Sequence, residues 1–257
     1  MTRTLFVGDL HAKPDLLEPV SRIADQCHAD RLILLGDLND DWNLSNNAAI
    51  RAFRRLAAWW RMEHERRDTI LLLGNHDIAY WMKPGSAAYA RVRRASPGFK
   101  PGAHRAIHQM MHELPVTLAW SDGRVLATHA GVTRPWARVT IRGYETMSPT
   151  VIADWLNRSL TDTGRLGRLY DATGPARGGT GLPGPLWADE SELTRFAEPR
   201  LLQVVGHTPV HTVTHRANAW YCDTMSTRPD GTPIGDHTLL LMDDASGAPM
   251  FEVVPLA

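Results

Sequence analysis

The chain has 257 residues, and its 28 Lys and Arg are balanced by 28 Asp and Glu, so the formal net charge at neutral pH is zero. This balance argues against a protein that coats nucleic acid through a broad positive surface. The 43% hydrophobic content is enough for a substantial core, and two cysteines, Cys27 and Cys222, exclude a disulfide framework or a thiolate zinc knuckle.

Hydropathy and cysteine content also bear on where the protein works. No apolar run reaches the ~18 residues that a membrane helix requires, and the first run is followed at once by Asp9. The sequence therefore predicts a cytoplasmic protein with no membrane partner. It leaves the oligomeric state open.

Short apolar runs that end in a polar cluster recur along the chain and predict buried strands. They cover residues 5–7, 32–35, 70–73, 125–127 and 204–205. Helical patterns lie between them, at residues 16–27, in a segment capped by Ser45, at residues 104–114 and after Ser148. Alternating strands and helices are typical of an α/β fold.

The second half of the chain is less regular. Residues 173–185 contain five glycines and three prolines, which predicts a loop. The pattern then becomes β-like over residues 211–221, 237–242 and 250–254, with a turn at 243–247. No internal repeat or long linker is present, so we expect a single domain over residues 1–257.

Each of the five predicted strands is followed by a side chain that can bind a metal ion. These side chains are Asp9, His11, Asp37, Asn75, His129 and His207. In open α/β sheets, functional groups collect at the carboxyl ends of the strands. Carboxylate, carboxamide and imidazole together suit Mn²⁺, Fe²⁺ or Zn²⁺, and six ligands exceed the needs of one tetrahedral zinc. The pattern therefore predicts a centre with two metal ions.

The motifs GDLH at 8–11, GD at 36–37, GNHD at 74–77, HAG at 129–131 and GH at 206–207 resemble, in this order, those of the calcineurin-like metallophosphoesterase superfamily. GPLW at 184–187 and GHTP at 206–209 are similar to the branch that contains serine/threonine protein phosphatases and symmetrical diadenosine tetraphosphatases. The resemblance implies a four-layer αββα sandwich.

The resemblance also implies roles for the ligands. Asp9, His11 and Asp37 would hold one metal ion, and Asp37 would bridge to a second ion. The second ion would be held by Asp37, Asn75, His129 and His207. The expected cofactors are two divalent transition-metal ions, with Mn²⁺ favoured and Fe, Zn, Ni or Co as alternatives.

His76 follows a predicted ligand, and the ordinary pKa of histidine suits a group that protonates a leaving alkoxide. The resemblance implies that Asp40 orients His76. Asp41 stands where phosphoprotein phosphatases carry a phosphate-binding arginine, so another guanidinium must bind the phosphate. The candidates are Arg134, Arg177 and Arg195, and Arg195 is favoured.

We therefore predict a dinuclear metal-dependent phosphatase that hydrolyses a phosphomonoester, on a phosphoprotein or a small phosphorylated metabolite, by attack of a metal-bound hydroxide. The main alternative is a dinucleoside polyphosphate hydrolase in which Trp42 or Trp81 stacks a base. A phosphodiesterase or nuclease is disfavoured by the zero net charge, and a non-catalytic scaffold by the intact ligand set. The expected partner is the phosphorylated substrate, without broad binding of nucleic acid.

A further pattern is the spacing of His104, His108 and His112, which places three imidazoles on one helix face. No glutamate of a zinc-binding motif accompanies them. We expect this face to be solvated or to face the active site.

Overall fold

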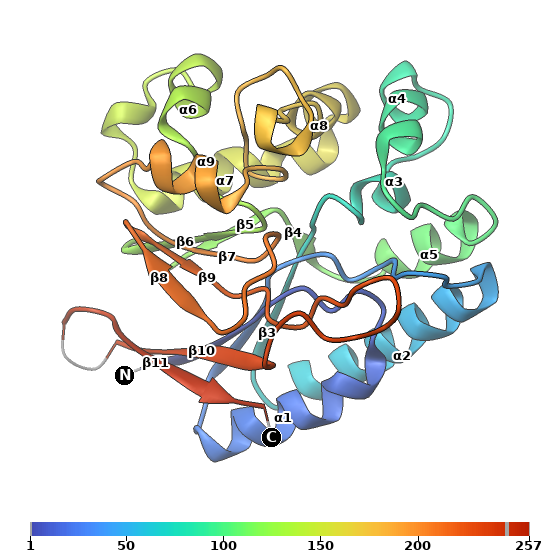
Figure 1. Ribbon diagram of the computed structural model, residues 1–257, viewed down its shortest axis with the longest axis horizontal. Helices are drawn as coiled ribbons and strands as arrows, with labels where there is room; N and C mark the ends of the chain where they lie inside the picture. Colours follow the sequence, from blue (N-terminus) through green and yellow to red (C-terminus); the bar gives the residue numbers. More distant parts are fainter. Residues whose placement is uncertain (1, 245–246, 257) are drawn as a thin grey trace.

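Two β-sheets lie face to face in the computed structural model, which describes residues 2–244 and 247–256 (Figure 1). One sheet has the strand order β11-β10-β1-β2-β3-β4 and the other the order β5-β6-β7-β9-β8. The strands of the first sheet are β1 (Arg3–Val7), β2 (Arg31–Leu34), β3 (Asp68–Leu72), β4 (Val116–Thr117), β10 (Thr238–Asp243) and β11 (Met250–Pro255). Those of the second are β5 (Ala119–Ser121), β6 (Val125–Thr128), β7 (Leu202–Val205), β8 (Thr214–Arg216) and β9 (Ala219–Tyr221).

Parallel strands form the centre of each sheet, so their carboxyl ends lie at the same edge of that sheet. β1, β2, β3 and β4 pair in parallel, as do β6, β7 and β9. The antiparallel strand pairs lie at the sides of the sheets, for example between β1 and β10 and between β5 and β6. The five predicted strands are confirmed, whereas the short β4 and β5 had no signal in the sequence.

The core follows from side-chain alternation along the strands. In β1, Leu5 and Val7 belong to the cluster that also holds the residues of the flanking helices, whereas Phe6 belongs to the cluster between the two sheets. In β2, Leu32 and Ile33 divide in the same way. Because successive side chains of a strand point to opposite faces, a strand covered on both faces is apolar throughout.

Helices cover the outer face of each sheet, which completes the four-layer αββα sandwich (Figure 1). On the side of the first sheet lie α1 (Leu17–Gln26), α2 (Asn46–His64) and α5 (His104–Met111). On the side of the second lie α6 (Arg134–Thr140), α7 (Pro149–Asn157), α8 (Thr163–Tyr170) and α9 (Glu190–Arg195). After β3 come α3 (Ile78–Trp81) and α4 (Ala87–Ala95), and α4 packs against α8 on the side of the second sheet (Figure 1). No helix of the described residues is long and apolar enough to cross a membrane.

The predicted helices are confirmed, with small changes at their ends. The Ser45 side chain accepts a hydrogen bond from Ala48 N at 3.2 Å, as expected of an N-cap. Pro19 is the third residue of α1, in the first turn, where a missing N–H costs nothing. The helix predicted at residues 104–114 is α5, which ends at Met111.

The irregular segments differ more from prediction. Residues 173–185 form a loop, but a 3₁₀ turn spans Pro175–Arg177. Within 211–221, only Thr214–Arg216 and Ala219–Tyr221 are strands, paired as a hairpin. The turn predicted at 243–247 begins after β10 ends at Asp243, and residues 245–246 of that turn lie outside the described residues.

Candidate active site

The ends of five parallel strands bring the six predicted ligands together at one edge of the two sheets. Asp9, His11 and Asp37 form the first half of this cluster. His11 Nε2 lies 3.9 Å from Asp9 Oδ2 and 3.8 Å from Asp37 Oδ2. Both carboxylates are buried, at 0% and 2% exposed.

The second half of the cluster is centred on His129. Its Nε2 lies 3.5 Å from Asp37 Oδ1, 2.9 Å from Asn75 Oδ1 and 3.1 Å from His207 Nδ1. The ligand atoms of Asp37, His129 and His207 all lie within 4.8 Å of one another. Asp37 therefore contributes one oxygen to each half, as a bridging carboxylate requires.

Backbone carbonyls set which ring nitrogen of two ligand histidines is available. His11 Nδ1 lies 2.9 Å from the Asp40 carbonyl and His129 Nδ1 lies 2.9 Å from the Leu35 carbonyl. Because a carbonyl only accepts, each Nδ1 carries the proton and each Nε2 presents a lone pair to the cluster.

The local backbone explains why the motifs need glycine and tolerate strain. A Cβ at Gly74 would strike Asp37 Oδ1, and one at Gly206 would strike Asp9 Oδ1. His11, Asp37 and His207 adopt positive φ values of 45°, 47° and 65°. Such conformations are costly for residues with a side chain and concentrate at functional sites.

The charges of the cluster are those of a cation site. Burial, and then the neighbouring Asp223 and Asp37, raise the pKa of Asp9 well above its usual range. Burial raises the pKa of Asp37 to about 6, and it lowers the pKa of His129 to about 3. The charge of Arg177 lowers the pKa of Asp37 but does not outweigh burial, so the carboxylates are only partly compensated and divalent cations would supply the rest.

One contact tests directly whether these residues fit a metal ion. His129 Nε2 and Asn75 Oδ1 are 2.9 Å apart, and both are acceptors when His129 Nδ1 carries the proton. Two lone pairs at this distance repel each other unless a cation lies beside both of them. His207 also has a buried Nε2 without a hydrogen bond among the described residues. The residues present therefore fit two divalent metal ions.

Two buried acids support the ligands, although the sequence pattern indicated no separate role for them. Asp77 accepts hydrogen bonds from the backbone of Gly74, Leu38 and Asn39 at 2.9–3.1 Å. It thereby joins the loop that carries Asp37 to the loop that carries Asn75. Asp223 is 1% exposed and its charge raises the pKa of Asp9.

His76 lies at the rim of the cluster. Its backbone N–H donates to Asp37 Oδ1 at 2.9 Å, and its Nε2 lies 3.9 Å from Asp37 Oδ2. Burial, followed by the charges of His129 and Lys100, lowers the pKa of His76 to about 3, although the nearby Pro97 carbonyl opposes this. Its ligand atom also lies within 4.8 Å of those of His11 and Asp37, so it is close enough to bind a metal itself.

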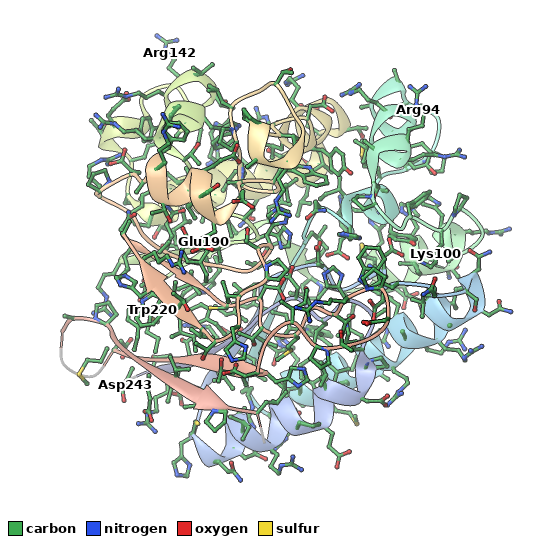
Figure 2. All side chains as sticks on the ribbon, viewed as in Figure 1. Arg94, Lys100, Arg142, Glu190, Trp220 and Asp243 are labelled. Atoms are coloured by element: carbon green, nitrogen blue, oxygen red, sulfur yellow. The ribbon has the colours of Figure 1, made fainter. Side chains whose placement is uncertain are left out.

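The structure shows no hydrogen bond between Asp40 and His76 among the described residues, so the orienting role of Asp40 stays a prediction. Asp40 Oδ1 accepts from the Tyr80 hydroxyl at 2.7 Å and from Lys100 Nζ at 3.2 Å. Asp40 Oδ2 and His76 Nδ1 are both buried and make no hydrogen bond among the described residues. Asp40 therefore belongs to a network with Tyr80 of α3 and with Lys100, which precedes α5 and is labelled in Figure 2.

The expectation that the histidine face of residues 104–112 is solvated or faces the active site holds for His112, which follows α5 and is exposed, whereas His104 is buried and His108 is half-buried. His104, His108 and His112 lie 2.9–3.1 Å from the carbonyls of Met82, Tyr80 and Trp81, respectively. These carbonyls end α3, where helical backbone acceptors lack partners. The three imidazoles therefore cap the helix that carries Tyr80.

A cleft of about 300 Å³ opens over the cluster, and its lining includes His11, Asp37, Asn75, His76 and His207. Arg195 does not line it, because this exposed side chain ends α9 with its guanidinium 5.2 Å from the Phe196 ring. Arg134 is also exposed and outside the lining.

Arg177 is the arginine that lines the cleft. Its Nη2 lies 3.0 Å from Thr208 Oγ1 and 3.2 Å from Asp189 Oδ2. Its Nε is buried and makes no hydrogen bond among the described residues. The preference for Arg195 is therefore replaced by Arg177, which the 3₁₀ turn in the glycine-rich loop carries into the cleft.

The αββα sandwich and a cluster of side chains that could hold metal ions are the features of a metal-dependent hydrolase. The family model for calcineurin-like phosphoesterases matches residues 2–230. The chain belongs to this family of dinuclear metal-dependent enzymes and is a hydrolase that acts on phosphate esters. The expectation of one domain over residues 1–257 remains a prediction.

Comparison with solved structures adds distant neighbours. The protein TT1561 of Thermus thermophilus is 15% identical, with a TM-score of 0.40 and coverage of 100% of this chain and 99% of that one. The phosphoesterase YfcE of E. coli is 15% identical, with a TM-score of 0.41 and coverage of 100% of both chains. The hypothetical protein PH1004 of Pyrococcus horikoshii is 11% identical, with a TM-score of 0.44 and coverage of 99% and 88%. No curated protein matches the chain.

Proposed function

We propose that the protein is a dinuclear phosphatase that releases phosphate from a phosphomonoester. The observation that carries this proposal is the pairing of the ligand cluster with one guanidinium, that of Arg177, in a single cleft. One metal-ligand cluster and one arginine can bind one phosphoryl group. The cleft volume of about 300 Å³ lies at the small end of small-molecule sites, so we favour a phosphorylated metabolite over a phosphoprotein.

The metal ions would be held as the family resemblance implies. Asp9, His11 and Asp37 would hold one ion, and Asp37, Asn75, His129 and His207 the other, with Mn²⁺ favoured because the donors mix imidazole with oxygen. When bound, the pair would lower the pKa of a water molecule and offset charge on the phosphoryl oxygens.

The chain itself would supply orientation and a proton. Thr208 and Asp189 hold Arg177 Nη2, so the guanidinium is fixed before a substrate arrives. Its Nε makes no hydrogen bond among the described residues, so the guanidinium keeps donor capacity for a phosphoryl oxygen. His76, at the rim of the cluster, is the group we propose as proton donor to the leaving oxygen, and Asp40 lines the same cleft. Because the pKa of His76 is about 3 without substrate, it would carry this proton only when the negative charge of a bound phosphoryl group raises that pKa.

A panel of substrates tests this function with Mn²⁺-loaded protein. It contains phenyl phosphate, glycerol phosphate, a phosphopeptide, bis(p-nitrophenyl) phosphate and diadenosine tetraphosphate. We expect the highest kcat/KM on a monoester. A clear preference for the diester would indicate a phosphodiesterase, and a preference for diadenosine tetraphosphate would establish the dinucleoside polyphosphate hydrolase instead.

A further inference from the structure

We propose that Trp42 is an aromatic platform for the leaving group, so that the preferred phosphomonoester carries a planar ring close to its phosphate. A nucleobase and a phenyl ring share this chemistry. The inference rests on the proposed phosphatase function and narrows its substrate class.

The first observation is the exposure of Trp42. Its exposed fraction is 57%, and every other Phe, Trp or Tyr in the described part of the chain is buried or partly buried. Trp42 also lines the cleft that contains His76 and Arg177. An exposed aromatic ring at the mouth of a site is an available apolar surface, whereas scattered exposed apolar residues elsewhere need no explanation.

The second observation is that this exposed ring is held in place. Trp42 Nε1 donates to the Thr227 carbonyl at 2.7 Å, and Trp42 N donates to Asp41 Oδ1 at 2.8 Å. Asp41 Oδ1 also accepts from Thr227 Oγ1 at 3.3 Å, and Asp41 Oδ2 lies 3.1 Å from Lys13 Nζ. Asp41 therefore braces the segment that carries the ring.

The contacts join two distant parts of the sequence. Trp42 lies in the loop before α2, and Thr227 lies in the connection between β9 and β10, which runs beside that loop in Figure 1. A second bond, from Asn43 Nδ2 to the Pro229 carbonyl at 3.3 Å, ties the same segments. The indole is held by its own bond to Thr227, and its loop is tied to the same segment through Asn43, so little rotational freedom remains to be lost when a ligand stacks on the ring.

The surroundings favour a neutral ring over a second phosphate. Pro97, Gly98 and Ile234 also line the cleft and offer apolar surface. The charged side chain next to Trp42 is the carboxylate of Asp41, which also lines the cleft and is paired with Lys13, so this pair offers no net positive charge to a second phosphate. Arg177 can bind one phosphoryl group, and Trp42 can stack on an uncharged planar substituent.

The test compares three monoesters on Mn²⁺-loaded wild type, Trp42→Ala and Trp42→Phe. Phenyl phosphate and adenosine monophosphate carry a ring, and glycerol phosphate carries none. We expect the ratio of kcat/KM on a ring substrate to kcat/KM on glycerol phosphate to fall about tenfold or more in Trp42→Ala, since base stacking on an aromatic side chain contributes at this level. Trp42→Phe should retain most of the ratio. Val139→Ala, at a 78% exposed apolar position on α6, is the control and should change nothing.

The two ring substrates distinguish a nucleotide from an aryl phosphate as the preferred substrate. A larger fall with adenosine monophosphate points to a nucleotide, and a larger fall with phenyl phosphate points to an aryl phosphate. An unchanged ratio for both in Trp42→Ala overturns the proposal.

A binding measurement keeps this inference separate from the proposed function. Saturation-transfer NMR of adenosine monophosphate with metal-free protein needs no catalysis, and we expect its ring signals to weaken in Trp42→Ala but not in Val139→Ala. If no monoester is hydrolysed, the phosphatase function fails while this measurement still decides on the platform. Equal ring signals in wild type and Trp42→Ala would rule the platform out.

Discussion

The Tyr80 hydroxyl donates to Asp40 Oδ1 over 2.7 Å and accepts a bond from Lys100 N at 2.9 Å, so one phenol joins the loop after β2 to the segment before α5. Tyr80→Phe should lower the free energy of unfolding by about 1–3 kcal/mol, because it leaves buried groups without partners. Urea unfolding measures this. Tyr89→Phe is the matched control, since the buried Tyr89 makes no hydrogen bond through its hydroxyl among the described residues. Equal effects of both substitutions would contradict the role given to Tyr80.

The ligand cluster predicts a metal content of about two ions per chain after Mn²⁺ loading. Elemental analysis checks this, and one equivalent at saturation would be incompatible with a dinuclear centre. Asp37→Asn should lower metal content and activity together, because Asp37 contributes to both halves of the cluster. Bound metal should also raise the Tm, and chelation should reverse the rise.

His76→Asn is expected to lower kcat by about 10²–10⁴-fold, the usual contribution of a general acid. Metal content should stay unchanged if His76 acts on the proton. Since p-nitrophenolate leaves without much protonation, glycerol phosphate hydrolysis should suffer more than p-nitrophenyl phosphate hydrolysis. Loss of one metal equivalent would show that His76 is a ligand, which its distance from Asp37 permits.

Arg177→Gln should reduce kcat/KM on phosphomonoesters by about tenfold to a hundredfold, as expected for a hydrogen bond to a charged group. Arg195→Gln provides the matched control, because Arg195 is exposed and lies outside the cleft lining. We expect Arg195→Gln to retain wild-type kinetics. The opposite ranking of the two variants would restore the assignment made from the sequence.

His104 predicts a pH dependence of stability. Burial, despite the bond to the Met82 carbonyl, lowers the pKa of His104, so the folded state binds fewer protons at this residue than the unfolded state does. Its contribution should therefore be lost as pH falls below about 6.5, the pKa of an unfolded histidine. His104→Gln should lose less stability than wild type between pH 7.5 and pH 5.5, measured by urea midpoints. The exposed His28→Gln should follow the wild-type curve, and so should His104→Gln if this reasoning is incorrect.

The clustering of the candidate ligands could be predicted because the signals for these residues are local. An apolar run, a glycine and a polar side chain describe Asp9, Asp37 and Asn75 within a few residues each, and parallel topology brings the run ends together. The structure explains why glycine occupies positions 74 and 206, since a Cβ at Gly74 or Gly206 would strike an oxygen of a candidate ligand.

The residues around the ligands could not be predicted in the same way. Arg177 enters the cleft because its guanidinium meets Thr208, 31 positions later, and nothing in the loop sequence indicates that contact. Asp40 bonds Tyr80 and Lys100, which lie 40 and 60 positions away. The histidines of α5 have a clear spacing, but their partners are backbone carbonyls, which every residue has and which the sequence therefore cannot identify.

The bridging of the two sheets by one ligand set has a mechanical consequence. Asp37 and Asn75 come from the first sheet, and His129 and His207 come from the second, so the second cation would act as a cross-link between the layers. Part of the free energy of metal binding then holds the sheets together, as a disulfide does in proteins that have one. Substituting any of these four candidate ligands would then loosen the layers as well as the site.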